Sequence, residues 1–151
     1  MLDNEENKQL LIKYLIHWEG IRYNAYKCSS GLNTIGIGST FYKDKSKVKE
    51  NDTITKEEAI NLCIWYINKY IIDCIKDLNL KNINQYIAII SLIYNIGNGA
   101  FMSSTLRKVL LNNGKEEEII SQWRRWNKIK GIVNNGLTKR RQEEIELFFK
   151  K

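Results

Sequence analysis

Apolar side chains recur at helical spacing over the first twenty residues of the chain. The i, i+3, i+4, i+7 spacing that gives a helix one apolar stripe is followed by Leu11, Tyr14, Leu15 and Trp18. Asp3 and Glu6 predict the start of this helix as a capping box, and Gly20 predicts its end, because glycine tolerates the left-handed turn there. We therefore expect Glu19 on the last helical turn.

The pattern changes after Gly20 from helical to short alternating segments. Tyr, Thr and Ile alternate with Gly, Ser and Asn across residues 22–40, which predicts a strand, a turn and a second strand. A hairpin that folds back over the helix end would bring Cys28 and Thr34 towards Glu19.

The remainder of the chain is predicted to be mostly helical, after a charged, flexible connection at residues 41–54. Thr55 and Glu58 match a second capping box, and apolar residues at helical spacing continue from there to Leu78. Further helices are expected at residues 84–95, from Ser103 or Ser104 to Leu111, at residues 116–127 and from Thr138 onward.

These elements predict an α+β fold that is mostly α. A small N-terminal lobe with a β-hairpin, residues 1–54, is joined by one long helix, residues 55–78, to a larger helical lobe, residues 79–151. The length of 151 residues predicts a single domain that buries a sizeable core. Cys63 and Cys74 are too far apart along one helix to form a disulfide, so we expect both in the core.

The chain carries a formal net charge of +7, which indicates affinity for an anionic polymer without identifying that polymer. No nucleic-acid motif is present, and no basic run is longer than residues 139–141, so nucleic acid is not expected as a partner. His17 is the only histidine, so neither a metal site nor a cofactor is expected. We expect a monomer that is attracted to a negatively charged polymer or surface.

The location of the protein is predicted from its apolar runs and its first residues. No apolar run approaches the ~20 residues that span a bilayer, so stable membrane insertion is not expected. Acidic residues, Asp3, Glu5 and Glu6, stand where a secretory signal would carry basic ones. We therefore expect synthesis in the cytoplasm without a signal peptide.

Glu19 is the first candidate for chemistry. The negative end of the helix dipole disfavours a carboxylate at this position, and Trp18 and Ile21 would partly desolvate it. Both effects favour the neutral carboxylic acid, which is the form a general acid needs to protonate a glycosidic oxygen. Taken alone, Glu19 is equally well a surface carboxylate that ends a helix.

The spacing of three polar residues favours a catalytic role for Glu19 over that of a surface carboxylate. A Glu, eight residues, an Asp or Cys, five residues and a Thr are matched by Glu19, Cys28 and Thr34, and T-I-G-I-G follows. This pattern resembles the phage-type lysozymes, the endolysins of glycoside hydrolase family 24. The similarity extends over residues 91–106, the W-x-x-W at Trp123 to Trp126 and the segment of residues 136–144.

The resemblance implies a muramidase, which hydrolyses the β-1,4 bond between N-acetylmuramic acid and N-acetylglucosamine in peptidoglycan. It implies that Asn95 contacts the sugar, although Asn95 could equally cap a helix, and that Arg140 or Arg141 pairs with Glu19. A solvated basic face is the alternative for both arginines. The resemblance also implies action at the cell wall or periplasm after release by a holin or another route.

A mechanism is expected in which Glu19 protonates the leaving oxygen and Thr34 orients a water molecule. Cys28 occupies the position of the family's Asp and stabilises an oxocarbenium ion if Arg22 or Lys27 lowers the pKa of the thiol. As a thiolate Cys28 could also attack the anomeric carbon, so inversion and retention both stay open.

Other functions compete with hydrolysis. A catalytically silent module would keep the fold and bind glycan strands or an envelope partner. A nucleic-acid-binding domain would show salt-sensitive retention of DNA without lysis. A transglycosylase would release anhydro products, so the chemistry of the released muropeptides separates these functions.

Overall fold

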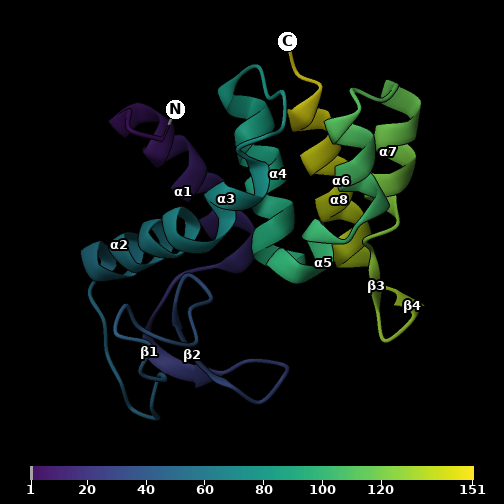
Figure 1. The fold of residues 1–151 in the computed structure, drawn as a ribbon. Coiled ribbons are helices and arrows are strands. Elements are labelled where there is room, and N and C mark those ends of the chain that lie inside the picture. The colour runs from purple at the N-terminus through teal and green to yellow at the C-terminus, as the bar shows by residue number, and fades with distance from the viewer. Residues whose placement is uncertain (1) are drawn as a thin grey trace. The chain divides into compact units, whose positions relative to one another are not determined.

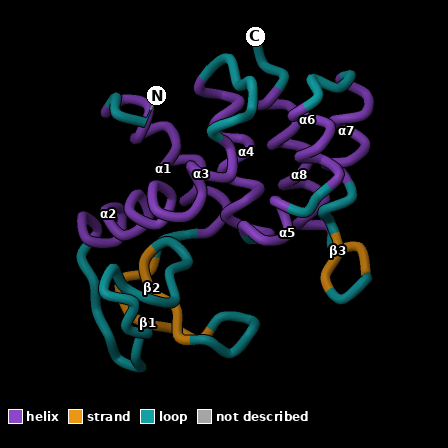
Figure 2. Tube along the Cα trace, in the orientation of Figure 1, coloured by secondary structure: helices purple, strands orange, loops and turns teal. Residues whose placement is uncertain are grey.

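The computed structural model describes residues 2–151, which form two compact units (Figure 1). Unit 1 ends at Lys69 and unit 2 runs from Tyr70 to Lys151. Most of the described chain is helical, and the strands form two small antiparallel sheets (Figure 2). The predicted α+β, mostly helical fold is therefore confirmed, while its division into lobes at residues 1–54 and 79–151 stays a prediction.

In unit 1, helix α1 (Glu5–Glu19) ends where the sequence predicts. Gly20 has φ 72°, and its N–H donates to the carbonyl of Ile16. The start differs by one residue from the prediction, because Asn4 rather than Asp3 caps the helix and its side chain accepts from the Asn7 N–H. An extended Asn with a short acceptor side chain satisfies this orphan donor well.

Strands β1 (Arg22–Lys27) and β2 (Asn33–Gly36) form the predicted hairpin, with Tyr26 opposite Thr34. Their register is interrupted between Arg22 and Tyr26, because the backbone there pairs with residues 52–54 instead. The segment of residues 41–54 is therefore hydrogen-bonded to β1, which corrects the prediction of a flexible connection.

The predicted long helix is interrupted. Helix α2 (Lys56–Tyr66) begins with the capping box of Thr55 and Glu58, and a π-helical turn, η1 (Ile67–Ile71), separates it from α3 (Ile72–Ile75). The expectation of one continuous helix is thus wrong. The boundary between the two units, at Lys69 and Tyr70, falls inside η1.

Cys63 and Cys74 are both buried and unbridged, as predicted.

Unit 2 is built around α4 (Ile83–Ile96), which buries seven consecutive residues from Ile87 to Ile93. Its other elements are α5 (Asn98–Met102), α6 (Thr105–Leu111), α7 (Glu116–Arg124), β3 (Lys128–Ile129), β4 (Ile132–Val133) and α8 (Asn135–Phe148). Ser104 caps α6, which confirms one of the two predicted candidates. Thr138 does not cap α8: Asn134 does, because its side chain accepts from the Leu137 N–H at 2.9 Å.

A buried charged cluster joins α8 to the rest of unit 2. Glu144 is fully buried, with Oε1 2.6 Å from Arg141 Nε and Oε2 3.7 Å from Arg140 Nε. Trp123 Nε1 donates to the same carboxylate at 3.4 Å, and Arg140 donates to the Ser91 carbonyl at 3.0 Å. Burial raises the pKa of Glu144, and the two guanidinium groups oppose that rise.

The alternative of a solvated basic face at Arg140 and Arg141 is therefore wrong, because both side chains are buried. Their predicted pairing with Glu19 stays a prediction.

Candidate active site

The turn that connects β1 to β2 holds Cys28 between two hydroxyl groups. Cys28 Sγ lies 2.9 Å from Ser30 Oγ, and the Cys28 N–H donates to the Leu32 carbonyl at 3.0 Å. Gly31 closes the turn by donating its N–H to the Cys28 carbonyl, at φ 81°. Thr34 lies at the start of β2 and is only 3% exposed.

These hydroxyl groups change the chemistry of the thiol. Hydrogen bonds from the side chains of Ser30 and Thr34 lower the pKa of Cys28 to about 6. The sequence led us to expect Arg22 or Lys27 in this role, and that cause is wrong, because neighbouring hydroxyls supply the shift. A thiolate, not a thiol, is therefore the dominant form of Cys28 at neutral pH.

Thr34 has one hydroxyl proton and two acceptors for it. Thr34 Oγ1 donates to the Leu32 carbonyl at 3.1 Å, and the same proton can instead turn to Cys28. Ser30 donates to the Cys28 thiolate when Thr34 donates to the Leu32 carbonyl. Thr34 therefore has lone pairs available for a water molecule in that arrangement.

Tyr26 connects the hairpin to the end of α1. Its ring lies 4.8 Å from the guanidinium carbon of Arg22. Burial raises the pKa of Tyr26, the charge of Arg22 lowers it, and the charges of Cys28 and Glu19 raise it further. The hairpin register places Tyr26 directly opposite Thr34.

Sequence reasoning did not single out Tyr26 or Ser30. Tyr26 could have been found from the hairpin register, since it stands directly opposite Thr34. Ser30 gave a weaker signal, because its hydroxyl reaches Cys28 only through the shape of the turn.

Asn95 lies in unit 2 on the last turn of α4 and is exposed. It lines a hollow of about 510 Å³ together with Arg125, Trp126 and Lys128. Asn95 is not the cap of α4, because the helix ends on Gly97, whose N–H donates to the Ile93 carbonyl. The alternative of a capping role is thus excluded, and the sugar-binding role stays a prediction.

Comparison with known protein families identifies the family of this chain. A family model described as phage lysozyme matches residues 16–144, which include Glu19, Cys28, Thr34 and Asn95. The chain belongs to the phage lysozyme family. The predicted resemblance to phage-type lysozymes is thereby confirmed.

Individual members of the phage lysozyme family match over most of the chain. The endolysin of Acyrthosiphon pisum secondary endosymbiont phage 1 is 36% identical over 154 residues, which cover 95% of each chain. The endolysin of Bacillus phage B103 is 33% identical over 91% of this chain, which spans only 51% of that relative's length. A crystal structure of a mutant P22 lysozyme matches with a TM-score of 0.78 and 31% identity, covering 97% of both chains.

The two tryptophans of the W-x-x-W motif differ in this phage lysozyme. Trp123 is fully buried, its ring centroid lies 5.2 Å from that of Phe148, and it belongs to the core. Trp126 is half-buried and lines both the Asn95 hollow and a second hollow of about 560 Å³ in unit 2. Trp126 therefore presents an indole surface to each hollow.

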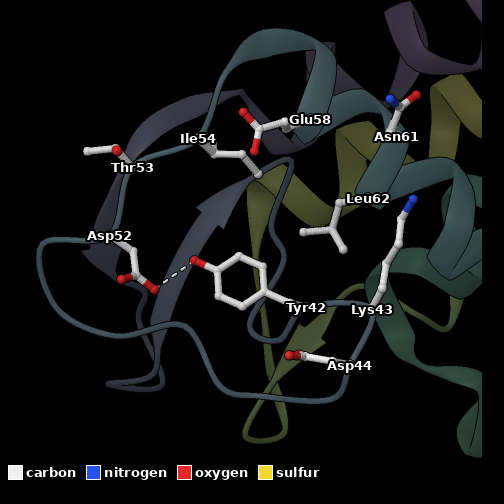
Figure 3. A pocket seen from close by; sticks show the side chains of 9 residues that line it. All are labelled: Tyr42, Lys43, Asp44, Asp52, Thr53, Ile54, Glu58, Asn61 and Leu62. Atoms are coloured by element: carbon white, nitrogen blue, oxygen red, sulfur yellow. Dashed lines mark hydrogen bonds between the residues drawn. The ribbon is translucent and has the colours of Figure 1, made fainter.

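Unit 1 of the phage lysozyme has a separate hollow of about 600 Å³ between the segment of residues 42–54 and the start of α2 (Figure 3). Tyr42 points to Asp52 there and donates its hydroxyl proton to Oδ2 at 2.7 Å. Burial, and after it this hydrogen bond to Asp52, raises the pKa of Tyr42 to about 12. Asp52 also accepts the Lys49 N–H, which lowers the pKa of that carboxyl. Glu19, Cys28 and Thr34 do not line this hollow.

Across residues 2–151, no group of three or more His, Cys, Asp or Glu side chains is arranged to hold a metal ion. Among the described helices, none combines the length and hydropathy required to cross a membrane.

Proposed function

We propose that this chain is a muramidase of the endolysin type, which hydrolyses the β-1,4 bond between N-acetylmuramic acid and N-acetylglucosamine in bacterial peptidoglycan. Membership of the phage lysozyme family and the endolysin relatives support the lysozyme class. One observation on this chain carries the proposal: the hairpin that follows Glu19 at the end of α1 holds Cys28 Sγ 2.9 Å from Ser30 Oγ, with Thr34 at the start of the second strand.

Glu19 is the general acid. It is the last residue of α1 and is only partly exposed. The neutral acid donates its proton to the glycosidic oxygen as the bond breaks.

Cys28 supplies the negative charge that an Asp supplies in other members of the family. With a pKa of about 6, about nine-tenths of the thiol is ionised at pH 7. The thiolate stabilises the oxocarbenium ion on the sugar ring. Hydrogen bonds to the sulfur and its lowered pKa reduce its nucleophilicity, which favours this electrostatic role over attack on the anomeric carbon.

Thr34 orients the attacking water. No carboxylate occurs in residues 21–43, so no general base of the usual kind is available on the hairpin. With its proton on the Leu32 carbonyl, Thr34 Oγ1 accepts a hydrogen bond from water. A water held in this way adds to the anomeric carbon of the oxocarbenium ion from the face opposite the leaving group, loses its proton to solvent and gives the inverted configuration.

The hollow at Asn95 in unit 2 contributes to substrate binding. The Asn95 amide offers one acceptor and two donors, and Trp126 offers an indole face of the kind that stacks on pyranose rings. Action on peptidoglycan requires that the protein reach the wall, which we propose occurs after release through a holin or another route during host lysis.

The Cys28 position tests the electrostatic role. Cys28→Asp should keep peptidoglycan clearance within about tenfold of the unsubstituted protein, and Cys28→Ser should lose about a hundredfold because the charge is gone. Activity should fall as the pH drops below about 6, since protonation of the thiolate removes its charge. In Cys28→Asp this acid limb should move to about pH 4, where a carboxyl titrates.

Turbidity clearance of cells with exposed peptidoglycan, measured across pH, checks these outcomes. Ser29→Ala, at an exposed neighbouring residue, is the matched control and should behave like the unsubstituted chain. Equal activity of Cys28→Ser and the unsubstituted protein would show that charge at Cys28 has no role.

A further inference from the structure

The excess positive charge of the chain is concentrated in one segment. Residues 119–142 contain seven Lys and Arg residues and no Asp or Glu. Because the whole chain has a formal net charge of +7, the remainder is formally neutral. The charge is therefore a local feature of unit 2, not a general property of the surface.

Two of these seven cations, Arg140 and Arg141, are buried with Glu144 and neutralised in part by it. The other five are exposed and form no ion pair within residues 2–151: Arg124, Arg125, Lys128, Lys130 and Lys139. The exposed cations come from the end of α7, from the β3–β4 hairpin and from α8.

The β3–β4 hairpin carries an exposed apolar surface among these cations. Ile129, Ile132 and Val133 are 54%, 75% and 56% exposed, and Ile132 is the most exposed large apolar residue described. A two-residue turn at Lys130 (φ 50°) and Gly131 (φ 78°) joins the strands, and the hairpin extends beyond the helices of unit 2 (Figure 1). These β-branched side chains are left in water.

We propose that the β3–β4 hairpin binds the surface of an anionic lipid bilayer. The exposed cations would lie at the level of the lipid phosphates. Ile129 and Ile132 pair across the hairpin next to its turn and so share one face, and these two side chains would enter the boundary between headgroups and acyl chains. The hairpin is too short to span a bilayer, so the contact is peripheral. Arg125, Lys128 and Ile129 also line the Asn95 hollow, so this surface borders the proposed substrate site. The proposal itself rests on the exposure and charge of the hairpin and does not depend on the proposed catalysis.

Charge and shape favour a bilayer over other occupants. A hydrated wall polymer would pair with the cations but offers no apolar phase for Ile129 and Ile132. A second copy of the chain would bring two unneutralised basic surfaces together, which is repulsive. Nucleic acid bases stack on aromatic side chains, and the exposed apolar residues of the hairpin are aliphatic.

Co-sedimentation of the full chain with vesicles tests the proposal. Phosphatidylcholine vesicles that contain phosphatidylglycerol should bind the protein at least about tenfold more strongly than pure phosphatidylcholine, and salt should weaken the binding. Lys130→Asn should weaken binding about fivefold and keep the turn, because Asn-Gly is favoured in it. Ile129→Thr with Ile132→Thr should weaken binding roughly tenfold and keep β-branched side chains in both strands.

Matched controls lie in unit 1. Lys45→Asn replaces an exposed lysine that also has positive φ, and Leu10→Gln replaces an exposed apolar residue of α1. Both should bind vesicles like the unsubstituted chain.

Two results would overturn the proposal. One is equal binding to both kinds of vesicle, or none to either. The other is unchanged binding of the double threonine variant. That result would show that charge is the sole cause of binding, and it would indicate an anionic polymer as the partner. Because no peptidoglycan is present, neither result bears on muramidase activity.

Discussion

Glu19→Gln is expected to lower peptidoglycan clearance by about a thousandfold, the largest loss of activity predicted for any single residue. Glutamine keeps the size of the side chain but has no acidic proton for the leaving oxygen, and loss of a general acid costs roughly 10²- to 10⁴-fold. Initial rates of turbidity loss, measured at equal protein concentration, check this outcome.

The fold of the Glu19 variant should be intact. Its thermal midpoint should not fall, since glutamine keeps the size of the side chain and Glu19 is partly exposed on the last turn of α1. Glu50→Gln, at an exposed position outside the hairpin, should clear cells normally. Clearance by Glu19→Gln near that of the unsubstituted chain would remove Glu19 from the mechanism.

Glu144→Gln is expected to destabilise the protein by about 3–5 kcal/mol. The amide cannot neutralise Arg140 and Arg141, which are both buried, so these two cations lose the charge of Glu144. For a chain of this size the thermal midpoint should fall by roughly 10 °C. Denaturant unfolding and calorimetry measure the two quantities.

The matched control lies on the same helix. Glu146 is exposed on α8, and Glu146→Gln should change the free energy of unfolding by less than about 0.5 kcal/mol. A loss for Glu144→Gln as small as that of Glu146→Gln would mean that the buried carboxylate contributes little to the cluster.

Local sequence signals predicted the elements that position the hairpin. The glycine after Glu19 and the capping box at Thr55 are short-range patterns, and the structure has both. Alternation of Tyr, Thr and Ile with Gly, Ser and Asn was enough to predict β1 and β2. The start of α1 and of α8 each shifted to an asparagine, because neighbouring Asp, Asn and Thr residues all suit a cap and only the backbone decides between them.

Features that depend on distant contacts were missed. The π-helical turn η1 has no sequence signature, and the strands of the β3–β4 hairpin are too short for alternation to register. Arg140 and Arg141 belong to a charged stretch that is typical of a solvated face, yet Ser91 and Trp123, far away in the sequence, help bury them.

In the candidate site, too, some features could be predicted from the sequence and others depend on the folded structure. The resemblance to the phage lysozyme pattern selected Glu19, Cys28 and Thr34, and the hairpin brings the last two together. The cause of the low thiol pKa could not be predicted, because it depends on how the turn directs the hydroxyl of Ser30. The sequence therefore led us to expect Arg22 or Lys27, instead of a hydroxyl group, as the cause of the lowered pKa of Cys28.

Mass spectrometry of muropeptides released from purified peptidoglycan tests the muramidase assignment most directly. Hydrolysis predicts soluble fragments that end in reducing N-acetylmuramic acid, and their absence when Glu19→Gln replaces the unsubstituted protein. Fragments ending in anhydro-N-acetylmuramic acid would identify a transglycosylase, and no released fragments would identify a silent module. Either of these results would contradict the hydrolytic mechanism.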